Sequence, residues 1–313
     1  CYNRIMQYRQ YRSDLLSVVG FGGIVVMDET PADAERIVGT AIDRGVTYFD
    51  VAPSYGNAEE RLGPALEPYR QNVFLACKTN IRNAAEAEQE LNASLKTLRT
   101  DHFDLYQIHG IQSQEEVDQA LAPGGVLEMI PRRREAGDIR YIGFSAHHED
   151  AALRLLDAFP FDSVLFPINR YVWHAGQVGP RMLDAARSRG AEVLALKALA
   201  DRRWHEGETH TWSKPWYKPV ERYEEAEIGL RFTLSRPVAA AAWPTASTRR
   251  VMRRRARTGA SAATTRRRRR PARRAARRRA ACSPRRTSPR AARWPAGSSR
   301  ALSRPAPRTP SLG

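Results

Sequence analysis

Short apolar runs and amphipathic stretches alternate along the chain over Val18–Leu234. After Thr30, apolar residues recur every three or four positions and therefore share one face of a helix. Thr30 can cap the first turn, Pro31 suits the position that follows, and Gly45 can end the helix. The next run, Val46–Asp50, has the length and composition of a buried strand.

The same unit repeats through this region. The predicted strands are Val18–Gly23, Val46–Asp50, Val73–Lys78, Phe103–His109, Arg140–Ser145, Ser163–Phe166, Glu192–Lys197 and Val238–Ala242. After the first helix, the predicted helical stretches are Ala58–Leu66, Ala84–Leu98, Glu115–Ala136, Asp150–Ala158, Gly179–Arg189 and Glu221–Leu234. Strands separated by helices form a parallel sheet with right-handed crossovers. Eight strands in about 225 residues fit an α/β fold of the (β/α)₈ TIM-barrel type better than an open sheet.

The composition changes sharply near the end of the last predicted strand. The 78 residues of Arg236–Gly313 hold 24 Arg and no Lys, Asp or Glu, so the overall net charge of +17 comes from this segment. Residues 1–235 carry 27 basic and 34 acidic side chains and are therefore mildly acidic. An Arg/Ala/Pro-rich segment buries too little apolar surface to offset its ordering entropy. We therefore expect a barrel over 1–242, missing or disordered at its final helix, and a disordered tail over 243–313.

Three explanations of the tail compete. Its dense runs, such as Arg266–Arg270, can neutralise phosphates and would suit a nucleic-acid-binding arm. It can also be a solvated extension without a partner. We favour a third explanation, a shifted reading frame in GC-rich DNA, because Lys, Asn, Ile, Phe and Tyr, which have AT-rich codons, are all missing from it.

Several classes of protein and site are disfavoured by the sequence. The chain has no apolar stretch of membrane-spanning length, and its first ten residues lack the apolar run of a signal peptide. Cys1, Cys77 and Cys282 are too far apart for a disulfide framework or a cysteine metal cluster, so a reducing cytoplasm is expected. Cys77 is expected to be a buried, inert thiol. His147 and His148 lack a third ligand at a suitable spacing, which favours a polar loop over a metal site.

Polar residues stand where three neighbouring predicted strands end. Asp50 ends the second strand and Tyr55 follows it, Lys78 ends the third, and His109 ends the fourth. The carboxyl ends of barrel strands meet at one mouth, where barrel enzymes carry their chemistry. A phenol can protonate a carbonyl oxygen if a nearby ammonium lowers its pKa from about 10. A buried Lys needs a counter-charge, and a neutral His can orient the carbonyl. No side chain here is a reductant, so a cofactor must deliver the hydride.

Three segments resemble the aldo-keto reductases. The first is Gly45–Gly56 continued by Glu59–Gly63, the second is Asp104–His109, and the third is Ile139–Ser145. The resemblance extends over about Gln7–Ala242. It implies reduction of an aldehyde or ketone by NADPH, or less often NADH, on a barrel without a separate dinucleotide-binding domain.

The resemblance also implies a role for each matched residue. Tyr55 is the general acid, Asp50 and Lys78 tune it, and His109 orients the carbonyl. The residues expected to bind the cofactor are Gly22, Gly23, Asp50, Ser145 and Lys197.

The chain departs from the family pattern around the cofactor. Ala146 stands where the family usually has Asn, and Leu165 where it has Gln. Leu196–Ala198 replaces the usual aromatic residue, as in a bacterial subgroup. No Pro/Gly loop for the pyrophosphate is recognisable from Trp243 onward.

We therefore expect a carbonyl reductase acting on a small molecule. The alternative is a catalytically impaired barrel whose basic tail contacts nucleic acid non-specifically; a barrel that partners potassium channels is a remote third. The loop Ala200–Pro219 carries aromatic side chains that can line a substrate pocket or pack a lid, and the sequence leaves both open. These are Trp204, Trp212, Trp216 and Tyr217.

Overall fold

The computed structural model describes residues 6–210, 214 and 217–243. The disordered tail expected over 243–313 lies, apart from Trp243, outside the described residues. The same holds for any helix that would follow the last strand.

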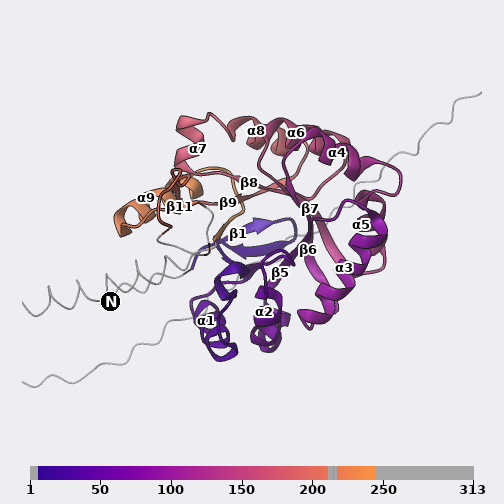
Figure 1. Ribbon diagram of the computed structural model, residues 1–313, viewed down its shortest axis with the longest axis horizontal. Helices are drawn as coiled ribbons and strands as arrows, with labels where there is room; N and C mark the ends of the chain where they lie inside the picture. The colour runs from indigo at the N-terminus through magenta and orange to yellow at the C-terminus, as the bar shows by residue number, and fades with distance from the viewer. Residues whose placement is uncertain (1–5, 211–213, 215–216, 244–313) are drawn as a thin grey trace, which may run out of the picture. The chain divides into compact units, whose positions relative to one another are not determined.

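Eight parallel strands form a closed barrel, which confirms the TIM-barrel prediction (Figure 1). The strands are β3 (Val19–Gly22), β4 (Tyr48–Asp50), β5 (Phe74–Thr79), β6 (Phe103–Ile111), β7 (Ile139–Ala146), β8 (Ser163–Pro167), β9 (Glu192–Leu196) and β12 (Ala240–Trp243). Closure comes from β12, which pairs with β9 on one side and with β3 on the other, where Ala241 lies opposite Val19.

Helices surround the strands and cover their outer faces (Figure 1). They are α1 (Pro31–Asp43), α2 (Ala58–Leu66), α3 (Ala84–Thr97), α4 (Gln114–Leu121), α5 (Val126–Glu135), α6 (Glu149–Ala158), α7 (Arg170–Ala175), α8 (Pro180–Ser188) and α9 (Tyr223–Leu234), with 3₁₀ turns η1 (Gly23–Val26) and η2 (Glu67–Asn72). Thr30 caps α1 by accepting a hydrogen bond from the backbone of Asp33, as its position predicted. Among the described residues, every helix is too short or too polar to span a membrane.

The helical stretch predicted over Glu115–Ala136 consists of two helices, α4 and α5. α4 ends where Ala122 takes an extended conformation. Gly124 follows with φ +74°, a left-handed conformation that favours glycine. A Cβ at Gly125 would lie 2.6 Å from the carbonyl oxygen of Gln119, so the chain passes this point too closely for any side chain. The spacing of apolar residues alone predicts one continuous helical stretch here, and the two glycines divide it into two helices.

An antiparallel hairpin precedes the barrel and was not predicted. Its strands are β1 (Tyr8–Tyr11) and β2 (Asp14–Ser17), and Figure 1 shows it across the centre of the ring of strands. Tyr11 and Leu16 are fully buried beneath it in the barrel interior. The guanidinium of Arg9 donates to the carbonyl oxygens of Leu234 and Val238, at 2.7 Å for Val238. The hairpin thus closes the amino end of the barrel and is bound to the segment that leads into β12.

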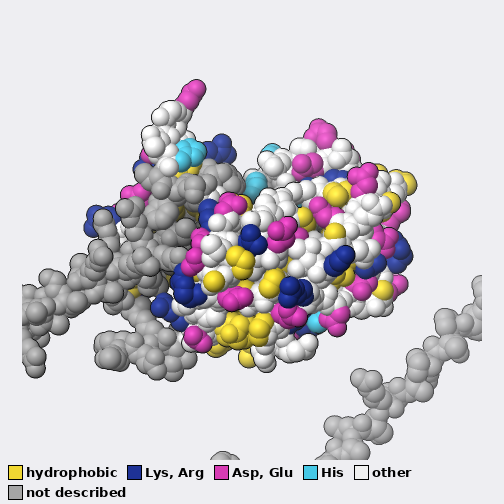
Figure 2. Space-filling view, turned by 60° about the horizontal axis from the view of Figure 1, so that its bottom comes forward, with side chains coloured by type: hydrophobic (Ala, Val, Ile, Leu, Met, Phe, Trp, Pro, Cys, Tyr) yellow, Lys and Arg dark blue, Asp and Glu magenta, His cyan; other side chains and the backbone are white. Residues whose placement is uncertain are grey.

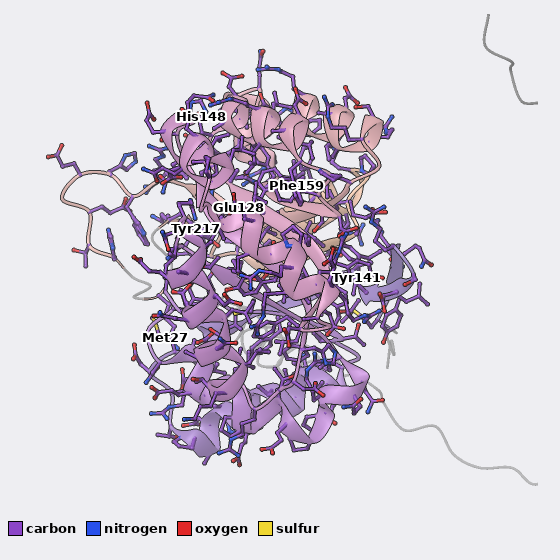
Figure 3. The ribbon with its side chains drawn as sticks, turned by 90° about the vertical axis from the view of Figure 1, so that its right-hand side faces the viewer. Met27, Glu128, Tyr141, His148, Phe159 and Tyr217 are labelled. Atoms are coloured by element: carbon purple, nitrogen blue, oxygen red, sulfur yellow. The ribbon has the colours of Figure 1, made fainter. Side chains whose placement is uncertain are left out.

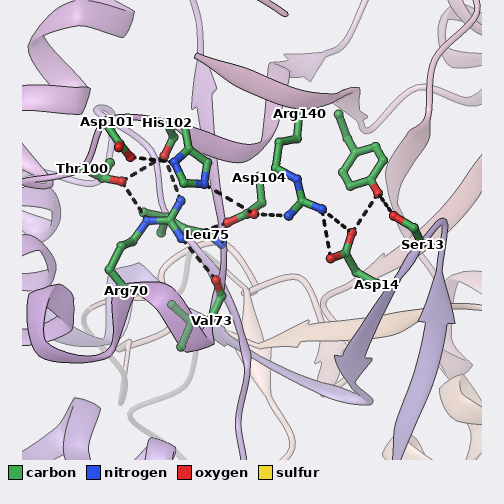
Figure 4. Close-up of polar contacts among 11 residues, drawn as sticks. Ser13, Asp14, Arg70, Val73, Leu75, Thr100, Asp101, His102, Asp104 and Arg140 are labelled. Carbon is green, nitrogen blue, oxygen red and sulfur yellow. Dashed lines mark hydrogen bonds and ion pairs between the residues drawn. The ribbon is translucent and has the colours of Figure 1, made fainter. Parts of the chain in front are cut away.

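A network of ion pairs and hydrogen bonds joins the hairpin to β6 and β7 at the amino end of the barrel (Figure 4). Asp104 at the start of β6 is 3.0 Å from the Arg70 guanidinium and 2.6 Å from that of Arg140. Arg140 also reaches Asp14 of the hairpin at 3.0 Å, and Tyr141 donates to the same carboxylate at 2.8 Å. Only 4% of the Asp104 side chain and 9% of that of Arg70 are exposed, so this pair is shielded from water.

We expect Asp104→Ala to lower the free energy of unfolding by about 3–5 kcal/mol, because it leaves the buried Arg70 without its carboxylate. Asp118→Ala is the matched control. It removes the carboxylate partner of Arg154 from a surface pair whose side chains are 63% and 45% exposed, and should cost about 1 kcal/mol or less. Urea denaturation of both variants measures the difference. Equal losses would show that the amino-end network does not depend on Asp104.

Candidate active site

Four polar side chains meet at the carboxyl end of the barrel. Asp50 is the last residue of β4, Tyr55 lies in the loop that follows, Lys78 is on β5, and His109 is on β6. Alternate residues of a strand face the same side. Lys78 lies beside Gln107 in register, and His109 is two positions further along β6 on the same face. The parallel strands therefore bring together the four residues that the sequence singled out.

Lys78 is the centre of this group. Its side chain is fully buried, and its ammonium forms an ion pair with Oδ1 of Asp50. The same nitrogen is 3.3 Å from the carbonyl oxygen of Val51 and 3.4 Å from the hydroxyl of Tyr55. Burial lowers the pKa of Lys78, but Asp50 and then Tyr55 outweigh it, so the pKa lies above its ordinary value. Lys78 therefore stays charged throughout the physiological range.

Tyr55 is partly buried, with its ring edge-on to that of His109 at 5.7 Å between centroids. Burial raises the pKa of the phenol, the Lys78 ammonium lowers it, and Asp50 raises it again. The Lys78 ammonium thus acts in the expected direction, but burial outweighs it and the net direction is upward. The ammonium offsets only part of the desolvation, whose size depends on depth in the mouth.

His109 is neutral. Burial lowers the pKa of its imidazole to about 2, assisted first by the Lys78 ammonium and then by His147 and Arg82. Its Nδ1 is 3.3 Å from the hydroxyl oxygen of Ser54, and its backbone carbonyl accepts a 2.7 Å hydrogen bond from Arg82. This agrees with the neutral imidazole expected from the sequence.

Two further side chains contact Asp50 from the side of the barrel interior. The hydroxyl of Tyr48 donates to Oδ2 of Asp50 at 3.2 Å, and Nε2 of Gln107 donates to the same oxygen at 3.1 Å. Neither residue was predicted from the sequence. A signal was present, because Tyr48 and Gln107 each precede a candidate residue by two positions on the same strand and therefore share its face.

The two glycines expected to bind the cofactor lie where β3 ends. Gly22 pairs in register with Asp50. A Cβ on Gly23 would lie 2.7 Å from Cγ2 of Val51 and 3.2 Å from the carbonyl oxygen of Asp50. Close packing against β4 is therefore enough to explain why residue 23 is glycine.

Ser145 and Lys197 lie at the same end of the barrel. The buried Ser145 hydroxyl oxygen, at the end of β7, accepts a 2.7 Å hydrogen bond from the backbone of Gly110. Lys197 follows β9, and its ammonium is 3.4 Å from Nδ1 of His147. Burial, with the nearby charge of Arg203, lowers the pKa of Lys197 to about 7. Burial and then Lys197 lower the pKa of His147 to about 4.

The other titratable candidates have structural contacts. The thiol of Cys77 is buried and donates to Glu59 at 3.3 Å, and burial raises its pKa well above the ordinary value, in agreement with an inert thiol. Nδ1 of His148 accepts from the backbone of Ala151 and caps α6. Among the described residues there is no group of three or more His, Cys, Asp or Glu suited to hold a metal.

The loop after β9 forms a short hairpin from β10 (Ala200–Arg202) and β11 (Lys218–Pro219). Trp204 stacks on His210 with ring centroids 4.5 Å apart, so Trp204 packs within this loop. Trp212 and Trp216 lie outside the described residues.

Of the loop's aromatic residues that the structure describes, Tyr217 lies beside the candidate site. It is 4% exposed, and the Lys197 ammonium lies 6.0 Å from its ring centroid. Figure 3 places Tyr217 and Met27 at the mouth and Tyr141 at the opposite end of the barrel. Lys214 of the same loop donates to Glu29 at 3.0 Å, so the loop reaches from β9 to the start of α1.

Comparison with known proteins agrees with this fold. The holo form of aldo-keto reductase AKR11C1 from Bacillus halodurans superposes with a TM-score of 0.60 at 23% identity, over 79% of this chain and 90% of that one. The glycerol dehydrogenase AKR11B4 from Gluconobacter oxydans superposes with a TM-score of 0.58 at 20% identity, over 78% of this chain and 89% of that one. At these identities the likeness establishes the fold.

Curated relatives match by sequence. Aldo-keto reductase YhdN of Bacillus subtilis (strain 168) is 32% identical over 149 residues, which is 42% of either chain. Aldo-keto reductase yakc [NADP(+)] of Schizosaccharomyces pombe (strain 972 / ATCC 24843) is 28% identical over 176 residues, half of either chain. The chain thus spans about half the length of the curated relatives it matches. The model of the Aldo/keto reductase family matches residues 19–206, more than half of the chain. The chain therefore belongs to the aldo/keto reductase family.

Proposed function

We propose that the chain reduces an aldehyde or ketone to an alcohol by hydride transfer from NAD(P)H, with Tyr55 as the general acid. The observation that carries the proposal is the position of the Tyr55 hydroxyl, 3.4 Å from a buried ammonium that is itself paired with Asp50. A cation beside a phenol favours the phenolate and so assists the loss of its proton.

NAD(P)H supplies the hydride when bound. Two residues at this end of the barrel suit its nicotinamide end, because Ser145 offers a hydroxyl and Lys197 a cation. Ala146 and Leu165 are buried within hydrophobic clusters of the barrel. Neither Ala146 nor Leu165 has an amide to bind the carboxamide, so we assign that contact to Ser145. Family usage favours NADPH over NADH, and the relative named for NADP(+) supports this choice.

Side chains of the chain itself orient the carbonyl group and transfer the proton. If Nδ1 of His109 accepts from Ser54, the neutral imidazole carries its proton on Nε2 and can donate to the carbonyl oxygen. Tyr55 then protonates that oxygen as negative charge develops on it. The resulting phenolate is stabilised by Lys78, which Asp50 holds in place.

The extent of the barrel defines the catalytic domain, which we propose to be residues 1–242. We further propose that its substrate is a small carbonyl compound. The cytoplasmic location and the nucleic-acid contact stay predictions, and the latter rests on residues outside the described part. On the face seen in Figure 2, basic and acidic side chains are interspersed rather than gathered into the basic stripe of a nucleic-acid-binding protein.

Tyr55→Phe should lower the turnover of carbonyl reduction by about a hundredfold or more while the affinity for NADPH stays unchanged, because only the acidic hydroxyl is lost. Steady-state kinetics and a fluorescence titration with NADPH measure the two effects. Tyr171→Phe, which removes the hydroxyl of a side chain 47% exposed, is the control and should behave as the parent chain. Unchanged turnover in Tyr55→Phe would remove Tyr55 from the mechanism.

Lys78→Met should abolish most of the turnover and also destabilise the fold by about 3–5 kcal/mol, because Asp50 stays buried without its counter-charge. The double variant Asp50→Asn/Lys78→Met should regain part of the stability and none of the turnover. Urea denaturation and initial rates separate the two effects. Recovery of turnover in the double variant would show that Lys78 serves only to neutralise Asp50.

Because the pKa of Lys197 is lowered into the physiological range, we expect cofactor binding to depend on pH. With a pKa of about 7, Lys197 is charged below and neutral above that pH, and a bound cofactor phosphate would favour the charged form. The dissociation constants of NADPH and NADH should therefore rise by about tenfold between pH 6 and pH 8. Lys197→Met should make both nearly independent of pH in the same titration. The same slope in this variant would assign the titrating group elsewhere.

A further inference from the structure

Asp50 is bound on both carboxylate oxygens. Lys78 pairs with Oδ1, while Tyr48 and Gln107 donate to Oδ2 at 3.2 Å and 3.1 Å. Tyr48 and Gln107 are both completely buried, on β4 and β6 respectively. The two side chains thus fill the space beneath the carboxylate and limit its rotation.

The Gln107 amide has a second feature that packing does not explain. Its nitrogen must face Asp50, because an ionised carboxylate only accepts hydrogen bonds. Its Oε1 is consequently buried, with no hydrogen-bond partner among the described residues. A buried polar atom without a partner opposes folding, so an apolar side chain of similar size would suit the barrel interior at least as well.

We propose that Gln107, together with Tyr48, is a positioning residue that holds Oδ2 of Asp50 and so keeps the Lys78 ammonium directed at Tyr55. This role rests on the carbonyl-reductase function proposed above. Neither side chain need touch substrate or cofactor, because both act through Asp50.

The physical reason is a competition for the charge of Lys78. Asp50 and Tyr55 both attract the ammonium, which lies between them. Two donors on Oδ2 withdraw part of the carboxylate's charge, so the ammonium stabilises the phenolate of Tyr55 more strongly. Removing either donor strengthens the hold of Asp50 on Lys78 and raises the pKa of Tyr55.

Several titratable groups lie close enough to Tyr55 to change its pKa. Lys78, Asp50 and Cys77 act on it directly. The phenols of Tyr48 and Tyr217 also interact electrostatically with it, and the neutral ring of His109 packs edge-on to it. Apart from the Tyr48 phenol, each of these groups is still present in the variants below, and Asp50 loses only one hydrogen bond at Oδ2.

The test compares Gln107→Leu and Tyr48→Phe with Tyr11→Phe in the whole chain of 313 residues. Tyr11 is the matched control because it is also completely buried inside the barrel, but its hydroxyl donates to Ser163 at 2.9 Å rather than to Asp50. Tyrosine labelled with ¹³C at Cζ reports the titration of each phenol by NMR. The resonance that disappears in Tyr55→Phe identifies Tyr55.

We expect the midpoint of the Tyr55 titration to move upward by about half a pH unit or more in Gln107→Leu and Tyr48→Phe, and to stay in place in Tyr11→Phe. The kcat for carbonyl reduction should fall about two- to threefold for a shift of this size in the first two variants, with an unchanged KM, because the acid has become weaker. The thermal midpoint of Gln107→Leu should stay close to that of the parent, because the orphaned oxygen is removed together with the hydrogen bond.

Two results would overturn the proposal. One is an unchanged Tyr55 midpoint in Gln107→Leu and Tyr48→Phe. The other is a loss of activity in Gln107→Leu that merely follows a loss of stability, as a packing role would produce. If the parent chain reduces no carbonyl compound, the proposed function fails, but the NMR titration still decides whether Gln107 and Tyr48 act on Tyr55 through Asp50.

Discussion

The ion pair between Lys78 and Asp50 is the constraint on which this site depends. An ammonium and a carboxylate buried inside a barrel are tolerated only when each has enough partners to replace water. Here the partners are supplied by three neighbouring strands: Tyr48 with Asp50 on β4, Lys78 on β5, and Gln107 on β6. Because this buried ion pair needs hydrogen-bond partners, it determines which side chains can occupy the carboxyl end of the barrel.

Stability and chemistry are placed at opposite ends of the barrel. At the amino end the hairpin and the ion pairs of Asp104 with Arg70 and Arg140 bind the strands together. At the mouth, burial moves the pKa values of His109 and Lys197 far from their ordinary ranges, which is unfavourable for the charged forms. The contacts that bind the strands together are thus separate from the desolvated polar groups at the mouth.

Much of this architecture can be predicted from the sequence because the barrel strands and the helices around them follow regular periods. The positions of Asp50, Lys78 and His109 at the strand ends follow from the same pattern. Tyr48 and Gln107 were within reach of it, since period two places them beside those residues. The hairpin was not, because β1 and β2 are each four residues long and lack a clear alternation of buried and exposed positions. The upward direction of the Tyr55 pKa depends on its depth, which no local pattern encodes.

The contact between Arg9 and the carbonyl oxygens of Leu234 and Val238 joins the two ends of the barrel sequence. The pairing of β12 with β3 does the same, so both can form only after β12 itself has left the ribosome. Until then β3 and β9 each present an unpaired strand edge, and such edges are prone to associate with other chains. The nascent barrel therefore passes through a period of vulnerability whose length is set by the time needed to synthesise its last strand.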